Sequence, residues 1–504
     1  MTNGIRCIYR IMGKKIITYL LCAFMCGLPV IPCTAQTQLT LSDAIRIAHD
    51  RSYDSQVARF SFLASYWTYR SFKAQLLPSM NLSGNLMNYD RSIVETRNYE
   101  DGRVKYVENN SLANSLTLSV DQNILTTGGT VSLQSYLYRL DQFDYDMKTY
   151  NTQPLRISYT QPLRTYNELK WEKKTAPMEY MLAQKQYLET MQDITIETTQ
   201  LFFSVLAAQS SYNQAFQTYA DRQALYDIAK KRFELGTVTK SDILQMELSL
   251  LNEQVNVNDK KLQLHDRLFR FFSFLRLTDY DDAELVPPYS IPDLLVDVDE
   301  VFRKAQENTS YAYTQQLNML SANKELAQAR SSKGIQVSLS TELGFTQSAS
   351  SFSSAYSRLR DNEIIGLSIS LPIFDWGVSK GRVKMAEAQV EMAKTKVEQA
   401  QMELEQTIAR KVMELNSQPM QCRNALRAQD ISAERYEISK RMFTAGSISV
   451  TELNTAQTEM ESAKAQYINQ LQTFWVDYYD LQKSTLYDWI LQKDIDVDFD
   501  KLVK

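Results

Sequence analysis

The chain has 504 residues but only 14 glycines and 11 prolines, so it predicts long, uninterrupted segments rather than many short elements. Its formal net charge of −4 at pH 7 makes it a poor candidate for binding nucleic acid. Its two histidines lack partners at ligand spacing, and no phosphate-binding loop, dinucleotide motif or nucleophile elbow is present, which argues against a metal site and an enzyme.

The N-terminal segment has the pattern of a cleaved secretory signal. Four basic residues precede an apolar run over residues 16–30, and this run of about 15 residues is shorter than the ~20 that a spanning helix needs. Removal of residues 1–35 would take away four positive charges and leave 51 Lys and Arg against 59 Asp and Glu. Cys422 would then be the one cysteine, which excludes an intramolecular disulfide. Lipidation stays open, although each cysteine between residues 20 and 35 follows a bulky or rigid residue.

The rest of the chain is an internal duplication. The segment RFELGTVTKSDIL (232–244) is echoed by MFTAGSISVTELN (442–454), which places Gly236 over Gly446 at an offset of 446 − 236 = 210 residues. SYTQPL is echoed by SISLPI at the same offset. Nearer the start of each half, Leu41 overlays Val298 at an offset of 257, so the first half carries 257 − 210 = 47 additional residues.

Each half therefore predicts a helix, a strand, a loop, a strand, a very long helix, a glycine turn and a final helix. The expected organisation is a signal peptide at 1–35, a first repeat at 36–277, a linker at 278–299, a second repeat at 300–485 and a C-terminal segment at 486–504. Strands are expected at about 79–163 and about 335–373. The acidic, proline-rich linker is interpreted as a surface connection, because its acids lack the spacing of a calcium loop.

The segments after the strands predict long coiled-coil helices. Val383, Val390, Val397 and Leu404 are seven residues apart, with small residues three positions later. About 65 helical residues before Gly236 would extend ~100 Å, and such a helix must pack against others. Pro177 and Pro419 are expected to mark kinks or local breaks.

The two glycine turns predict helical hairpins. Glycine readily adopts the left-handed conformation that ends a helix, and the next helix in each half begins with a capping-box pattern. These patterns run from Thr239 to Asp242 and from Ser449 to Glu452. A docking or gating role for the turns would be additional to capping.

The strand segments alternate apolar and small polar residues, as in Val337-Ser-Leu339-Ser-Thr341. This pattern suits a membrane barrel with lipid outside and water inside, or a half-buried soluble sheet. Export and the absence of another run of 18 apolar residues favour the barrel. One chain has too few strands for a wide pore, so the barrel is expected to be shared between subunits. The 47 additional residues form either a further hairpin or a surface loop.

With these motifs in view, the sequence resembles the TolC-like outer membrane efflux proteins. The opening LTLSDAIRIAHD (39–50), the strand-to-helix motifs SYTQPL and SISLPIFDWG, and the paired turns carry the resemblance over nearly the whole chain after residue 35. It implies a mainly α fold with membrane β structure: a homotrimer in which a transmembrane β-barrel, shared between subunits, continues into a helical periplasmic tunnel.

The resemblance also implies a passive, non-enzymatic exit duct for small molecules, such as drugs and toxic compounds, or for proteins. Such a duct lies in the outer membrane with a large periplasmic portion, contacts outer membrane lipid, and needs no cofactor. Its partners are a periplasmic adaptor (membrane fusion) protein and an inner-membrane transporter.

The resemblance also assigns roles to residues at the two turns. In the family the adaptor tip meets these turns, which correspond here to Phe233, Leu235, Gly236, Thr237, Thr239, Phe443, Ala445, Gly446, Ser447 and Ser449. The family closes its periplasmic entrance with acids six and nine positions beyond the second glycine, which here are Glu452 and Thr455. Thr455 departs from that pattern. Asp242 is the first-half equivalent of Glu452 and is expected to hold the closed state through a polar link.

Two other classes of protein compete with the exit duct. A non-conducting periplasmic coiled-coil spacer would explain the heptads but not the alternating strands at equal positions in both halves. An exported enzyme on a helical scaffold would need a convergent polar site, and the sequence shows none.

Overall fold

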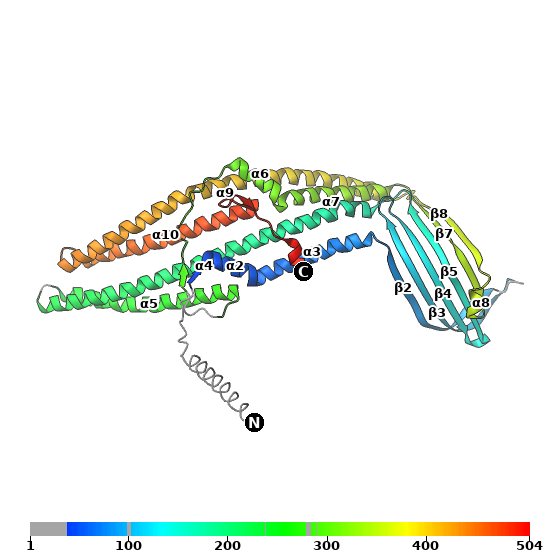
Figure 1. Cartoon of the computed structure of the whole chain (residues 1–504), viewed down its shortest axis with the longest axis horizontal. Helices are drawn as coiled ribbons and strands as arrows, with labels where there is room; N and C mark the ends of the chain where they lie inside the picture. The colour runs from blue at the N-terminus through cyan, green and yellow to red at the C-terminus, as the bar shows by residue number, and fades with distance from the viewer. Residues whose placement is uncertain (1–37, 98–101, 237, 279–283, 289, 504) are drawn as a thin grey trace, which may run out of the picture.

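The structure is a computed structural model that describes residues 38–97, 102–236, 238–278, 284–288 and 290–503. The expected signal peptide, residues 1–35, lies outside the described residues. The described chain is elongated, with helical hairpins at one end and a six-stranded sheet at the other (Figure 1).

Each half has two short helices before its strands and a long helical hairpin after them. The first half contains α2 (Leu41–Arg51), α3 (Tyr53–Gln75), α4 (Glu168–Glu234) and α5 (Lys240–Leu275). The second contains α6 (Val298–Asn308), α7 (Ser310–Lys333), α9 (Val378–Ala445) and α10 (Val450–Thr485). The minor elements are β1 (Gln38–Thr40), η1 (Phe143–Tyr145), β6 (Glu284–Val286), α8 (Phe352–Ala355), β9 (Tyr487–Asp488), β10 (Lys493–Asp494) and α11 (Phe499–Val503).

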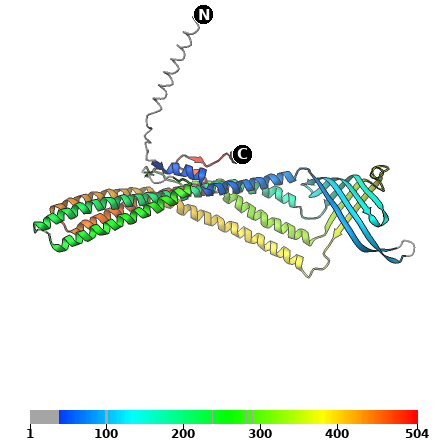
Figure 2. The same ribbon diagram turned by 90° about the horizontal axis from the view of Figure 1, so that it is seen from below.

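The two long helices, α4 and α9, have 67 and 68 residues, so each extends ~100 Å, as the sequence predicts. Both run through their proline, Pro177 or Pro419, and neither proline ends its helix. The local breaks expected at these positions are therefore absent from α4 and α9. In Figure 2 the helices of the two halves lie together at the turn end and diverge towards the sheet.

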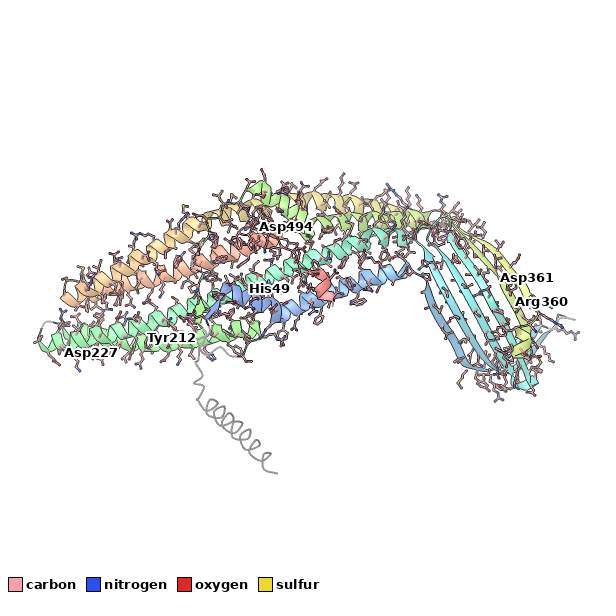
Figure 3. The ribbon with its side chains drawn as sticks, in the orientation of Figure 1. His49, Tyr212, Asp227, Arg360, Asp361 and Asp494 are labelled. Atoms are coloured by element: carbon pink, nitrogen blue, oxygen red, sulfur yellow. The ribbon has the colours of Figure 1, made fainter. Side chains whose placement is uncertain are left out.

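The main core lies midway along the helices, where the short helices pack against the hairpins. Phe202 and Phe203 of α4 and Phe271 of α5 are fully buried there. His49 of α2 is half-buried against α4, with its Nε2 2.8 Å from the Thr195 hydroxyl (Figure 3).

The inter-repeat linker is more than a surface connection. Its residue Leu285 is 3 % exposed and Val296 is 4 % exposed, and both belong to core clusters. Leu285 lies in β6, which pairs in parallel with β1 at the start of the described chain. The expected surface position is wrong for these two residues, because apolar side chains between the acids pack against the helices.

The sheet is antiparallel with the strand order β2-β3-β4-β5-β7-β8. The first half supplies β2 (Ser79–Arg97), β3 (Val104–Ile124), β4 (Gly129–Gln142) and β5 (Met147–Pro162), and the second supplies β7 (Gln336–Ala349) and β8 (Arg360–Ser370). The extra residues of the first half therefore form a further hairpin in the same sheet, which decides between the two alternatives left open by the sequence.

The register gives the sheet one polar and one apolar face. One row across all six strands is Asn81, Ser119, Gln134, Arg156, Gly344 and Asn362. The adjacent row, on the other face, is Met80, Val120, Leu133, Ile157 and Leu343, and it ends at Glu363. Successive residues of a strand point to opposite faces, so the alternation predicted from the sequence is present in the sheet.

No helix in the described part of the chain combines the length and the apolar character needed to cross a membrane. The predicted fold class, duplicated halves with long helical hairpins and a sheet, is confirmed.

Candidate functional site

The first helical turn joins α4 to α5 and follows from one glycine. Gly236 has φ of +74°, the left-handed region that residues with a Cβ rarely adopt. Its N–H donates to the Phe233 carbonyl over 2.9 Å, which closes the end of α4. Leu235, just before it, is 79 % exposed, and Thr237, just after it, lies outside the described residues.

The second turn joins α9 to α10 in the same way. Gly446 has φ of +85° and donates to the Phe443 carbonyl over 2.9 Å, while the Ser447 N–H donates to the Met442 carbonyl over 2.9 Å. These two bonds satisfy carbonyls that the end of α9 would leave unpaired. Ala445, Ser447 and Ser449 are exposed.

Both predicted capping boxes are present. The Asp242 N–H donates to the Thr239 hydroxyl over 3.2 Å, and the Thr239 N–H donates to the Asp242 carboxylate over 3.2 Å. The Glu452 N–H donates to the Ser449 hydroxyl over 3.2 Å, and the Ser449 N–H donates to the Glu452 carboxylate over 3.0 Å. The two acids assigned to the gate therefore also start α5 and α10.

The remaining gate residue, Thr455, lies one turn beyond Glu452 on the exposed side of α10. Its hydroxyl donates to the Thr451 carbonyl over 3.0 Å. The neighbouring residues Leu453 and Ala456 are buried against the other helices, so Glu452 and Thr455 point away from the packed interior of the single chain.

The two turns differ in how they place their phenylalanines. Phe233 is exposed, and Lys240 lies over its ring, 5.8 Å from the centroid. Phe443 is half-buried and packs against the cluster that contains Leu225, Met246 and Leu453. The first turn thus offers an apolar outer surface, whereas the second contributes to the packing between the hairpins.

A groove of about 290 Å³ lies between the turns. Its lining residues come from both hairpins and include Arg232, Val238, Asp242, Phe443, Gly446 and Ser449. The Arg232 guanidinium bridges the groove by donating to the Thr444 carbonyl over 2.8 Å. Asp242 thus faces the second turn across this groove, while its carboxylate is held by Thr239.

Polar contacts between the hairpins lie further along the helices than the turn residue Asp242, for which a polar link is expected. The Asp221 carboxylate of α4 accepts from the Lys440 ammonium over 2.6 Å and from the Tyr436 hydroxyl over 3.2 Å. Arg222 donates to Asn454 over 3.3 Å and to Gln457 over 3.1 Å, both on α10. Burial and the neighbouring Asp221 carboxylate raise the pKa of Tyr436.

No sequence motif or repeat marks these inter-hairpin residues. At the repeat offset of 210, Asp221 overlays Ile431 and Arg222 overlays Ser432, so the internal duplication does not mark them. Their partners lie more than 200 residues away in the chain. Periodicity and capping patterns, which are local, could not find them.

A second cluster of charge lies between α9 and α10, nearer the middle of the helices. Asp477 is half-buried, and the Gln418 side chain donates to its carboxylate over 3.1 Å. Burial, followed by the nearby Glu414 carboxylate, raises the pKa of Asp477 to about 6. Lys411 pairs with Asp480 over 2.7 Å in the same cluster.

Among solved structures, three outer membrane proteins illustrate the likeness of the fold. The CmeC outer membrane channel of Campylobacter jejuni is 16 % identical, with 92 % of this chain and 88 % of that chain covered and a TM-score of 0.62. The outer membrane protein VceC of Vibrio cholerae is 13 % identical, with coverages of 90 % and 97 % and a TM-score of 0.61. The open state of the Neisseria gonorrhoeae MtrE outer membrane channel is 14 % identical, with coverages of 91 % and 91 % and a TM-score of 0.58.

A search of curated proteins finds no match. The family model described as outer membrane efflux protein, in contrast, matches residues 44–272 and 305–482, which include all six strands of the sheet and both long hairpins except the last three residues of α5 and of α10. The chain therefore belongs to the outer membrane efflux protein family.

Proposed function

We propose that three copies of this chain form a passive exit duct that receives substrates from an inner-membrane transporter through a periplasmic adaptor. Family membership supports the outer membrane location and a transport role rather than an enzymatic one. One observation carries the proposal. A single chain joins a sheet with one polar and one apolar face to uninterrupted helices of 67 and 68 residues.

The apolar face of the sheet suits contact with outer membrane lipid. Leu82, Leu133 and Leu367 on this face are between 42 % and 67 % exposed. Exposure of these apolar side chains to water is unfavourable, whereas contact with lipid removes that cost. Aromatic pairs flank it: Tyr89 and Phe143 at the far end, and Phe374 and Trp376 at the helix junction. Aromatic side chains favour the boundary between lipid and water.

The helical turns are proposed to receive the adaptor. Leu235 and Phe233 present exposed apolar surface beside the groove of about 290 Å³, whose walls also carry Arg232 and Asp242. An apolar anchor beside polar groups is typical of a docking surface. The second turn supplies Gly446 and Ser449 to the same groove.

The periplasmic gate is proposed to contain Glu452. Glu452 is exposed on α10, beside the second turn, and points away from the packed interior of the single chain. Threefold symmetry would bring three of these carboxylates together, where they repel one another and attract cations. Thr455 on the same side adds no charge, so the gate would carry one acidic ring.

The proposed function is tested by outer membrane fractionation followed by bilayer recordings of the purified protein. Extraction from the outer membrane together with discrete single-channel openings is expected. A protein that is periplasmic, or that gives no conductance in planar bilayers, would support the coiled-coil spacer instead.

The docking assignment needs its own experiment, because a duct could conduct without it. A photo-crosslinking residue at Leu235 is expected to capture the adaptor in intact cells, and the pump should co-purify with that product. The same probe at Glu434, an exposed residue of α9 away from the turns, serves as the control. Equal capture at both positions would reject docking at the turn.

A further inference from the structure

A cavity of about 380 Å³ lies among α3, α4 and α7, towards the ends of these helices that join the sheet. Three aromatic rings and two carboxylates contribute to its lining: Tyr69, Phe72, Tyr180, Glu172 and Glu179. None of its lining residues belongs to the two turns, the gate or the sheet. The roles assigned above therefore leave this cavity without a function.

The aromatic side of the cavity is already assembled. The Tyr69 and Tyr180 rings stack with 5.0 Å between their centroids and 11° between their planes. The Lys73 ammonium lies 4.4 Å from the centroid of the Tyr69 ring, so this cluster already holds one cation. The Phe72 ring, about one turn further along α3, is half-buried and has no aromatic partner among the described residues. The face of an aromatic ring attracts cations, and Phe72 offers such a face to a ligand.

The carboxylates give the cavity a negative charge. Glu172 and Glu179 lie on one side of α4, because residues seven positions apart in a helix share a face. Among the described residues neither carboxylate forms a salt bridge. Lys324, the one basic residue among the described lining residues, lies 3.8 Å from the carboxylate of Glu168, which is outside the lining. A cation in the cavity would therefore be attracted by charge that the chain itself leaves unpaired.

The cavity lies on the side of α3 and α4 that is opposite the C-terminal segment. Arg59 of α3 donates to a carbonyl of α11 over 3.3 Å, and Leu188 of α4 belongs to the core cluster that contains residues of α11. With 3.6 residues in each helical turn, Phe72 lies about 140° around α3 from Arg59. Glu172 lies about 160° around α4 from Leu188 by the same geometry. The C-terminal segment and the cavity therefore occupy opposite faces of the helix layer.

This placement directs the cavity towards the lumen of a tunnel. α2 and the C-terminal end lie on the same side of the long helices (Figure 2). Thr195, which contacts α2, shares a face of α4 with Leu188, seven residues earlier. In a tunnel whose wall is one helix thick these elements lie outside, because three copies of them inside would fill the bore. The opposite face, with the cavity, then lines the lumen.

We propose that this cavity binds organic cations that carry an aromatic ring as they pass along the duct. The inference rests on the proposed function and adds a class of substrate. The aromatic part of the ligand packs against Phe72 and Tyr180, and its positive charge is attracted by Glu172 and Glu179. The volume of about 380 Å³ is within the range of pockets for small molecules. Because the rings are only half-buried, binding is weak enough to permit release, as conduction requires.

Fluorescence anisotropy of ethidium, a planar aromatic cation, measures this binding with the full-length protein in nanodiscs. We expect saturable binding to the wild-type protein. The double variant Glu172→Gln/Glu179→Gln should raise the Kd by at least about tenfold, because it removes the charge and keeps the shape of both side chains. Glu391→Gln/Glu398→Gln is the matched control: these exposed glutamates of α9 are also seven residues apart, and their loss should leave the Kd unchanged.

Phe72→Leu tests the aromatic contact separately from the charge. Leucine keeps an apolar side chain in the cavity and removes the ring, so the Kd for ethidium is expected to rise about two- to fivefold. An unchanged Kd in Phe72→Leu would remove the ring from the site.

A competition experiment needs no variant. Tetraphenylphosphonium, an aromatic cation, is expected to displace ethidium from the wild-type protein. The neutral triphenylphosphine oxide should not displace it, because it carries the rings without the net charge. This comparison tests the preference for cations even if a substitution in the cavity prevents assembly.

Each result decides the inference. An assembled Glu172→Gln/Glu179→Gln variant that binds ethidium as tightly as the wild type, or equal displacement by the neutral competitor, would overturn it. Failure of the site and failure of the duct are distinguishable. If the wild-type protein conducts in bilayers but shows no saturable ethidium binding, the exit duct stands and only the cation site is wrong. Binding by a protein that gives no conductance would overturn the role of the cavity in transport.

Discussion

At the scale of single residues, two glycines determine where the long helices end. Gly236 and Gly446 are the positions at which the chain reverses, and both adopt positive φ. The sequence alone predicts this, because the capping boxes that follow them are local patterns.

Gly446→Ala is expected to destabilise the second turn by about 1 kcal/mol, because an alanine is strained at φ of +85°. Gly381→Ala is the matched control within α9: its Cβ would meet no neighbour within 4 Å, and alanine favours helix. We expect the control to be neutral or slightly stabilising in thermal melts of the detergent-solubilised protein. A Gly446→Ala variant as stable as Gly381→Ala would contradict this account of the turn.

Asp477 predicts a pH dependence of stability. Its folded-state pKa of about 6 lies above the ordinary aspartate value, so the folded state favours the protonated form. The stabilisation from that proton is present at low pH and is lost as the pH rises through about 6. Asp477→Asn is therefore expected to stabilise the protein near neutral pH, by less than about 3 kcal/mol because solvent screens a half-buried group.

The measurement is the difference in melting temperature between Asp477→Asn and wild type. This difference cancels contributions from other groups, including His49, whose pKa burial lowers. A positive difference at about pH 8 that shrinks towards about pH 4 is expected. A difference that does not change with pH would show that Asp477 has an ordinary pKa.

At the scale of secondary-structure elements, the two faces of each strand serve different surroundings. Leu118 lies on the apolar face of β3 and is 42 % exposed, and Thr117 precedes it on the polar face. Leu118→Arg is expected to impair outer membrane assembly, because a charge facing the middle of the bilayer costs about 2–4 kcal/mol. Thr117→Arg should be tolerated, and the yield of assembled protein in outer membrane fractions measures both. Similar losses in the two variants would argue against the assignment of faces.

The contact between the two hairpins depends on the Asp221, Tyr436 and Lys440 group. Tyr436→Phe keeps the buried ring and removes the hydroxyl that donates to Asp221. We expect a loss of about 1–2 kcal/mol, because the hydroxyl is bonded to a charged acceptor. A double-mutant cycle with Asp221→Asn separates this bond from packing: a coupling energy near zero would show that the two side chains act independently.

At the scale of the whole molecule, the proposed gate at Glu452 forms only when several chains assemble. Glu452→Ala is expected to reduce cation selectivity and block by divalent ions in single-channel recordings, because it removes the acidic ring. The variant also loses a capping carboxylate, so Glu452→Gln, which retains the cap, is the second variant. Wild-type selectivity in both variants would reject Glu452 as the gate.

Much of the fold was predictable from local pattern. The helix lengths, both glycine turns, both capping boxes and the alternation of the strands follow from spacing within segments of the chain. The repeat offsets also located the additional residues of the first half. Of the kinks or local breaks expected at Pro177 and Pro419, the breaks do not occur, because packing along such long helices offsets the loss of one backbone hydrogen bond.

The sequence by itself determined the duplicated halves, which the repeated motifs reveal, and the glycine turns at which each long helix ends, since a turn and its capping box depend on residues a few positions apart. Only the tertiary structure decided that the extra residues extend the same sheet to six strands, and that Asp221 and Arg222 join the hairpins. The strand pairing and the hairpin contacts both join segments that are distant in the chain. They are stabilised by hydrogen bonds between surfaces that meet only in the folded protein, so no local sequence pattern predicts them.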